Sequence, residues 1–246
     1  MMRIRIDISY KGTNYHGWQI QENANSVQEE LNRALSLILN EKIETTGCGR
    51  TDAGVHARQY TAHFDSQKGL TDTKNIIYKL NSLLSKDIVV RDIYETYHGF
   101  HARFDAIKRT YKYFIHTYKD PFINEVSTFI YYEPDLHAMN EAAKILTGNR
   151  DFTSFCKHHS DVTNNFCKVF EAYWTRENDK FIFTISANRF LRNMVRAIVG
   201  TMLDIGRNKI NGVQEFEKII EARDRTKAGT SAPACGLFLW KNIYPS

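Results

Sequence analysis

A short polar loop in the first half of the chain carries the residues best suited to chemistry. It reads GRTDAGVHA over residues 49–57 and places Asp52 between two glycines, Gly49 and Gly54. Glycines allow backbone conformations with positive φ and let a ligand approach the chain closely. An Asp-X-Gly sequence is also common in ordinary turns, so the loop by itself indicates either a turn or a displayed carboxylate.

Other common catalytic motifs are missing from the sequence. It contains no GxxxxGK[ST], GxGxxG, HExxH or GxSxG pattern, which argues against nucleotide hydrolysis, dinucleotide redox chemistry and serine hydrolysis. Cys156, His158, His159 and Cys167 form a C-x-H-H-x7-C pattern that matches no common zinc site. The sequence therefore predicts chemistry without a cofactor or metal.

The composition is that of an ordered globular protein. Apolar residues make up 42% of the 246 residues and charged residues 25%, with four prolines, so a sizeable core and little disorder are expected. The net charge of +5 is mildly basic, and basic residues interleave with aromatic ones in FHARFDAIKRTYKYF (100–114). That mixture suits either a polyanion with bases that can stack or a Phe-rich core. The four cysteines form no CxxC pair, and no signal-peptide or membrane-spanning segment is evident, so a cytoplasmic protein without disulfides or membrane contact is expected.

Hydrophobic periodicity predicts two α+β halves, each with a mostly antiparallel sheet flanked by helices and each RRM-like or ferredoxin-like in character. The first half, residues 1–105, contains predicted strands at 3–10, 42–48, 57–65 and 88–96 and predicted helices at 26–39 and 73–84. The second half, residues 106–246, contains predicted strands at 108–116, 168–176, 180–187 and 236–243 and predicted helices at 135–146, 190–206 and 213–222. On the helix at 190–206, Arg189, Arg192 and Arg196 are expected within about 60° of one another, opposite an apolar side.

The motif loop and its surroundings resemble a known family. GCGRTDAGVHA (47–57) is similar to the signature of TruA-type tRNA pseudouridine synthases, and the resemblance continues in order along the chain. Further similar blocks are YKGTNYHGWQIQ with SVQEELNRAL, FHARFDAIKRTYKY, FLRNMVRAIVGTML and AGTSAPACGLFLW. Blocks spread over residues 3 to 240 make a chance match very improbable.

The resemblance implies an active site in a cleft between the two halves. By motif match, Asp52 corresponds to the family's catalytic aspartate, Tyr111 to its active-site tyrosine, and Arg196 to the arginine that pairs with the aspartate. The reaction cleaves the bond from N1 to C1′ of uridine and joins C5 to C1′, which calls for a carboxylate near the sugar and base. Asp52 acts either as a nucleophile on C1′ or as a base that yields a glycal; the sequence leaves both open. An adjacent arginine would keep the carboxylate ionised in a site that excludes water.

The sequence allows two interpretations of Tyr111. It is either a core tyrosine of the strand at 108–116 or a ring that stacks on the flipped uracil, because a base inside a paired stem must be extruded to be reached. Its hydroxyl is a candidate for removing the C5 proton.

RNA binding requires phosphate contacts from basic residues. The candidates, each inside or beside a similar block, are Arg50, Arg58, Arg103, Arg109 and Arg192, with Gln19 and His56 as further substrate-binding candidates. The family implies a homodimer that binds the anticodon arm of tRNA and modifies uridines at positions 38, 39 and 40. Two alternatives remain open: a non-catalytic RNA-binding protein, although no RNP1 pattern is present, and a nucleoside glycosidase, although only Asp52 stands out where two carboxylates are usual.

Overall fold

The computed structural model describes residues 1–157 and 164–245 of the chain. These form two compact units: unit 1 comprises Met1–Ile107 and Phe238–Ser246, and unit 2 comprises Lys108–Leu237. The sequence predicted two consecutive halves, residues 1–105 and 106–246. It did not predict that the last residues of the chain, Phe238–Ser246, group with the first unit.

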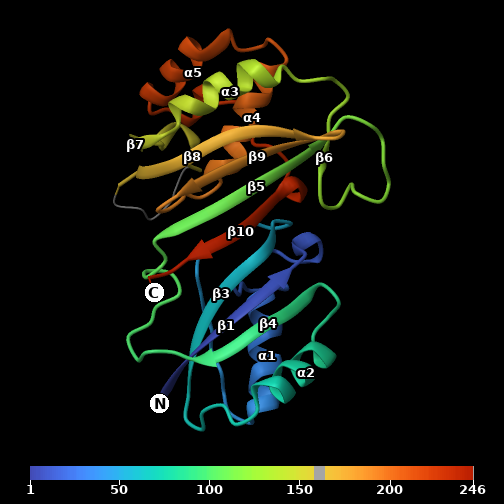
Figure 1. Ribbon diagram of the computed structural model, residues 1–246, viewed down its shortest axis with the longest axis vertical. Coiled ribbons are helices and arrows are strands. Elements are labelled where there is room, and N and C mark those ends of the chain that lie inside the picture. Colours follow the sequence, from blue (N-terminus) through green and yellow to red (C-terminus); the bar gives the residue numbers. More distant parts are fainter. Residues whose placement is uncertain (158–163, 246) are drawn as a thin grey trace. The chain divides into compact units, whose positions relative to one another are not determined.

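Unit 1 is a sheet with two helices (Figure 1). Its strands are β1 (Met2–Tyr10), β2 (Thr46–Gly47), β3 (His56–Ser66), β4 (Ile88–Glu95) and β10 (Leu237–Ile243), and its helices are α1 (Val27–Leu39) and α2 (Thr73–Leu83). The strand order is β4-β1-β3-β10, with β2 paired to β3. β1 runs antiparallel to both β3 and β4, whereas β10 runs parallel to β3.

The elements of unit 1 follow from its sequence pattern. Along β1 the isoleucines Ile4, Ile6 and Ile8 are fully buried, while the residues between them keep some exposure, as the period of two in a strand requires. α1 begins where the Ser26 hydroxyl accepts a hydrogen bond from the Glu29 amide at 3.2 Å. It ends at Asn40 in the left-handed conformation.

Unit 2 likewise combines paired strands with three α-helices among its described residues. Its strands are β5 (Lys108–His116), β6 (Thr128–Phe129), β7 (Gly148–Asp151), β8 (Phe166–Glu177) and β9 (Lys180–Ala187), and its helices are α3 (Leu136–Ile145), α4 (Met194–Gly206) and α5 (Gly212–Glu221). The order β5-β9-β8-β7 is antiparallel throughout, and β6 pairs in parallel with β5. Trp174 of β8 joins the sheet to α4 through its indole N–H, which donates to the Met202 sulfur at 3.2 Å.

The predicted fold class, α+β with mostly antiparallel sheets flanked by helices, is confirmed, but one prediction about the long helix was wrong. α4 begins only at Met194, because Asn193 adopts a left-handed conformation with φ of 65° and interrupts the chain before it. Arg189 and Arg192 therefore precede the helix, and the predicted basic helix face with Arg196 does not form. The helix is instead buried on nearly every side.

Candidate active site

The motif loop joins β2 to β3 in unit 1 and is held by the chain that follows β1. The buried hydroxyl of Thr51 lies 2.9 Å from the Tyr10 hydroxyl, and the Thr51 carbonyl accepts from the Trp18 amide at 3.4 Å. The Gly54 amide in turn donates to the Tyr15 carbonyl at 3.2 Å. Bonds on both sides of Asp52 therefore fix the loop against residues 10–18.

Two glycines let the two segments approach this closely. A Cβ atom added at Gly12 would lie 2.0 Å from the Val55 carbonyl oxygen, and one added at Gly17 would lie 2.3 Å from the Thr51 carbonyl oxygen. Gly17 also has a φ of 96°, which side-chain-bearing residues rarely adopt. The glycines of YKGTNYHGW therefore serve the loop at 49–55 through tertiary packing.

An aromatic pair holds the start of the loop. The Trp18 and Tyr60 rings stack with centroids 4.2 Å apart, and the Tyr60 hydroxyl donates to the Gly49 carbonyl at 2.5 Å. A Cβ atom at Gly47 would overlap this pair, since it would lie 2.0 Å from the Tyr60 hydroxyl. The start of the loop is therefore fixed as firmly as its end.

Asp52 opens a tight turn within this frame. Its carbonyl accepts from the Val55 amide at 3.1 Å, and Gly54, at the third position of the turn, has the positive φ of 76° that a type II turn requires. The Asp52 side chain itself is half-buried. The Asp-X-Gly turn, one of the two alternatives that the sequence indicated, is therefore present. The hydrogen bonds around it hold the Asp52 backbone in a fixed position, which suits the display of a carboxylate.

His56 lies in the same region but has no exposed surface. Its Nδ1 accepts from the Gly12 amide at 2.9 Å, and its ring packs 4.5 Å from that of Phe238. The buried imidazole therefore helps to position residues 12 and 55–57, while its predicted contact with the substrate stays a prediction.

The remaining candidates of unit 1 lie on its surface. Gln19, Arg50, Arg58 and Arg103 are all exposed. Arg50 lies within the motif loop and Arg58 directly follows it in the chain. The Arg103 guanidinium lies 5.5 Å from the centroid of the Phe104 ring. Their exposure is compatible with phosphate contacts.

Unit 2 places Tyr111 on β5, beside the segment that leads into α4. The Tyr111 ring meets the Phe190 ring edge to face with centroids 5.0 Å apart. Tyr111 remains half-buried, whereas Tyr113 on the same strand is fully buried and its hydroxyl donates to the Pro233 carbonyl at 2.7 Å. The burial of Tyr113 raises the pKa of its hydroxyl far above the ordinary value. Of these two tyrosines, Tyr111 is therefore the one with surface to offer a ligand.

Arg196 is the site candidate that α4 carries, and the chain at 228–236 orients it. The Arg196 Nε donates to the Ala232 carbonyl at 2.7 Å, and the Ala232 amide donates back to the Arg196 carbonyl at 2.9 Å. A Cβ atom at Gly200 would lie 1.8 Å from the Thr230 carbonyl oxygen, so the two segments are in direct backbone contact. This contact gives a physical reason for the small residues of AGTSAPACG.

Sequence reasoning missed Ser231 and Asn193 as supports of this arrangement. The Asn193 side-chain amide donates to the Ser231 hydroxyl at 2.6 Å, and the Arg225 guanidinium donates to the same hydroxyl at 3.0 Å. The only signal was that both residues stand inside blocks similar to the family.

Arg109 and Arg192 differ in their surroundings. The Arg109 Nη1 donates to the Asn188 carbonyl at 2.8 Å, which ties it to the end of β9, while Arg192 is exposed. His158 and His159 lie outside the described residues. Cys156 and Cys167 are buried, and burial raises the pKa of the Cys167 thiol to about 12, which keeps it protonated and unreactive.

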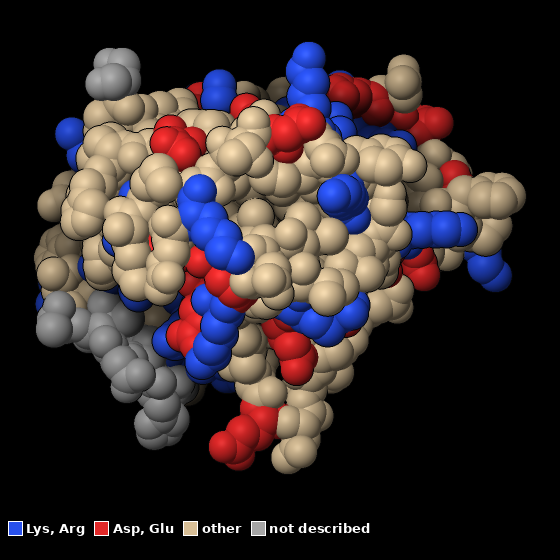
Figure 2. All heavy atoms as spheres, turned by 90° about the horizontal axis from the view of Figure 1, so that it is seen from below, with Lys and Arg blue, Asp and Glu red and all other residues tan. Residues whose placement is uncertain are grey.

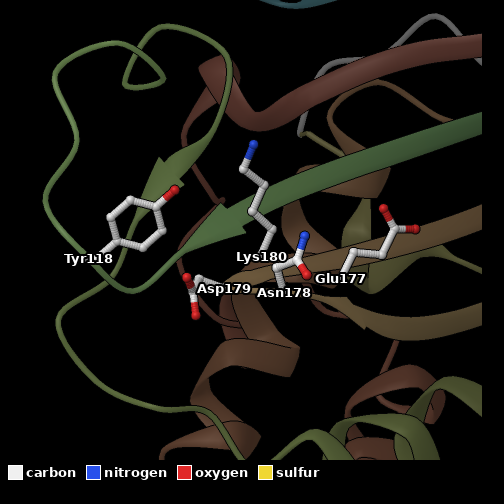
Figure 3. A pocket seen from close by; sticks show the side chains of 5 residues that line it. All are labelled: Tyr118, Glu177, Asn178, Asp179 and Lys180. Carbon is white, nitrogen blue, oxygen red and sulfur yellow. The ribbon is translucent and has the colours of Figure 1, made fainter.

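A hollow of about 390 Å³ lies in unit 2 at the turn between β8 and β9, lined by Tyr118 and residues 177–180 (Figure 3). Lys180 pairs with His116 at the far end of β5, while Tyr111 pairs with Ile185. Five residues of strand, about 17 Å, separate the two levels. None of the predicted site residues lines this hollow.

Figure 2 shows Lys and Arg side chains interspersed with Asp and Glu on the face it draws, so that face is not a continuous basic surface.

No helix within residues 1–157 and 164–245 combines the length and apolar character needed to span a bilayer.

A buried histidine in unit 1 gives a testable dependence of stability on pH. His63 is 6% exposed and its Nδ1 accepts from the Ala102 amide at 3.1 Å. Burial, with the nearby charge of Arg3, lowers the pKa of His63 from 6.5 to about 4. Because only the unfolded chain takes up this proton between those values, the free energy of unfolding should fall by about 1–2 kcal/mol from pH 7 to pH 5 on account of His63.

Urea denaturation at the two pH values tests this expectation. His63→Asn keeps an acceptor near the Nδ1 position but does not titrate, so it should lose less stability than the wild type over this interval. The exposed His98→Asn serves as the matched control and should follow the wild type. Equal pH dependence in wild type and His63→Asn would contradict the assignment.

Comparison with known proteins identifies the class of this chain. It belongs to the tRNA pseudouridine synthase family, whose model matches residues 8–105 and 142–245. The tRNA pseudouridine synthase A of Bacteroides thetaiotaomicron is 52% identical over 248 residues, covering 100% of this chain and 91% of that protein. Its counterpart in Bacillus subtilis is 40% identical over 247 residues, covering 99% of each chain. The resemblance seen in the motifs is thereby confirmed, and the chain is an RNA-modifying isomerase.

A solved structure also aligns with the chain. A chain in the crystal structure of a Cbf5-Nop10-Gar1 complex aligns with 96% of this chain and 57% of its own length, with a TM-score of 0.36 and 11% identity. The family assignment rests on the sequence relatives.

Proposed function

We propose that this enzyme converts uridine to pseudouridine at positions 38, 39 and 40 of the anticodon stem-loop of tRNA, with Asp52 as the catalytic residue. The observation that carries the proposal is the GRTDAGVHA loop, which hydrogen bonds to Tyr10, Tyr15 and Trp18 hold in place on both sides of a half-buried carboxylate. Such a mount keeps a reacting group in one place, which is the chief requirement for attack on a sugar carbon.

Asp52 takes one of two roles in this reaction. As a nucleophile its carboxylate adds to C1′ while the bond from C1′ to N1 breaks; the freed uracil turns, C5 bonds to C1′, and the carboxylate is released. As a base it removes a sugar proton to give a glycal, and returns that proton after C5 has bonded. In both cases the C5 proton is lost and N1 gains one, so no oxidant or reductant is needed.

Arg196 and Tyr111 are proposed to act on the same uridine. The Arg196 Nε is occupied by the Ala232 carbonyl at 2.7 Å, which restricts how the guanidinium can turn and suits it to pairing with a carboxylate. The half-exposed Tyr111 ring, supported by Phe190, suits stacking on an extruded uracil.

RNA contacts are proposed for the exposed side chains of both units, namely Arg50, Arg58, Arg103, Arg192 and Gln19, together with the partly exposed Arg109. The family resemblance also leads us to propose a homodimer that acts in the cytoplasm on the anticodon arm. Analytical ultracentrifugation with and without tRNA tests the homodimer, and a monomer at working concentration would refute it.

The choice of target positions is tested with tRNA transcripts in which uridines 38, 39 and 40 are replaced by cytidine, singly and together. Pseudouridine is then mapped by chemical modification and primer extension. Pseudouridine should vanish from each replaced position and be absent from the triple replacement. Modification that persists elsewhere in the triple replacement would overturn the choice of positions while leaving the activity intact.

The contribution of the Tyr111 hydroxyl can be tested separately from that of its ring. Tyr111→Phe keeps the aromatic contact with Phe190 but removes the hydroxyl, so kcat should fall by about 100-fold if the hydroxyl helps to remove the C5 proton. Tyr111→Leu should in addition weaken tRNA binding, because it removes the stacking surface. Single-turnover kinetics over a range of enzyme concentrations measures both effects, the rate at saturation for the chemical step and the half-saturating concentration for binding. Full turnover by Tyr111→Phe would eliminate the role in proton transfer.

A further inference from the structure

Unit 1 has an exposed ring, that of Phe104, beside the ring of His101 in the loop between β4 and β5. Phe104 is 73% exposed, yet its ring packs against His101 with centroids 4.2 Å apart and planes inclined by 33°. The guanidinium of Arg103 lies 5.5 Å from the same Phe104 ring. We call these three side chains the 101–104 platform.

Local hydrogen bonds make the platform rigid. The His101 Nδ1 accepts from the amides of Arg103 at 3.1 Å and Phe104 at 3.3 Å, which curls the chain into a tight turn beneath the rings. The Asp105 carboxylate accepts from the His101 amide at 2.8 Å and from the Tyr97 hydroxyl at 2.6 Å. An exposed ring on a fixed turn loses little conformational entropy when it binds something.

The platform is also anchored in the core of unit 1. Ala102, fully buried, donates its amide to His63 at 3.1 Å and accepts from the Tyr244 hydroxyl at 2.7 Å. The Arg3 Nη1 donates to the carbonyl of Phe100 at 2.5 Å. The core therefore fixes Ala102, while its neighbour Phe104 projects outward.

We propose that the 101–104 platform stacks on an unpaired nucleobase of the bound tRNA, with Arg103 contacting the neighbouring phosphate; this rests on the proposed function. A rigid, exposed ring beside a guanidinium is the arrangement by which proteins bind unpaired bases without regard to sequence.

The size of the platform favours a base over a second copy of the chain. A Phe side chain supplies at most about 250 Å² of contact, close to what one stacked base covers. A stable protein interface requires about 800 Å² from each partner.

The test compares Phe104→Ala with Phe104→Trp in the full-length enzyme. Phe104→Ala should weaken tRNA binding by about 10- to 100-fold, whereas Phe104→Trp, which keeps a stacking surface, should bind within about threefold of the wild type. Urea midpoints should be unchanged for both variants, because the ring is exposed. Binding of tRNA should also quench more fluorescence in Phe104→Trp than in the wild type.

Salt dependence separates stacking from charge. Phe104→Ala should leave the slope of log Kd against log salt unchanged, while Arg103→Gln should reduce that slope by about one phosphate contact. Wild-type tRNA affinity in Phe104→Ala would overturn the inference. If the sedimentation of that variant also changed, Phe104 would be assigned to a contact between copies of the chain. Because wild-type activity is measured separately, either result leaves the proposed isomerisation standing.

Discussion

Asp52→Asn is expected to lower single-turnover formation of pseudouridine in tRNA by about 10⁴-fold or more, equivalent to roughly 5.5 kcal/mol of transition-state stabilisation. The amide has nearly the shape of the carboxylate but can neither add to C1′ nor accept a proton from the sugar. Hydrogen bonds from the backbone of residues 49–55 and from the Thr51 side chain remain possible in Asp52→Asn and should continue to hold the loop.

The control for this variant is that it still folds and binds tRNA. Its thermal midpoint should match the wild type closely, and its Kd for tRNA should change by less than about tenfold. Turnover within tenfold of the wild type would remove Asp52 as the catalyst while leaving the activity of the chain unaffected.

Gly17→Ala is expected to destabilise unit 1 by about 2–4 kcal/mol and to reduce turnover by about 100-fold. The new methyl group would stand 2.3 Å from the Thr51 carbonyl oxygen, and Gly17 has a φ of 96°. Relief of this overlap must move the chain at 16–18 or the loop that carries Asp52, and a shift of about 1 Å is enough to disturb a reacting group.

Gly49→Ala provides the matched control for stability. Gly49 stands in the same loop, but an added Cβ atom would meet nothing within 4 Å. Urea denaturation should show a loss below about 1 kcal/mol for Gly49→Ala and the larger loss for Gly17→Ala. Equal losses would mean that the contact between Gly17 and Thr51 does not hold the loop.

Local sequence rules predicted most elements, because local interactions set them. The alternation of Ile4, Ile6 and Ile8 predicted β1, and the Ser26 cap predicted the start of α1, since a cap depends only on the next few residues. The motif loop was found in the same way, because its glycines and Asp52 are neighbours in the chain.

Features that depend on distant contacts were not predicted. Asn193 interrupts the helix pattern before α4, where its side chain bonds to Ser231, 38 positions away. The placement of β10 beside β3 joins residues about 180 positions apart. The structural role of His56 likewise arises from its bond to Gly12 and could not be read from the motif.

The most direct test of the account is release of tritium from a tRNA transcript labelled at C5 of uridine, incubated with the purified wild-type enzyme and no added cofactor or metal. Label should be released to water in proportion to the pseudouridine formed, because C5 exchanges its hydrogen for the bond to C1′. No release from any tRNA carrying uridine at positions 38, 39 and 40 would contradict it and favour a protein that binds RNA without modifying it.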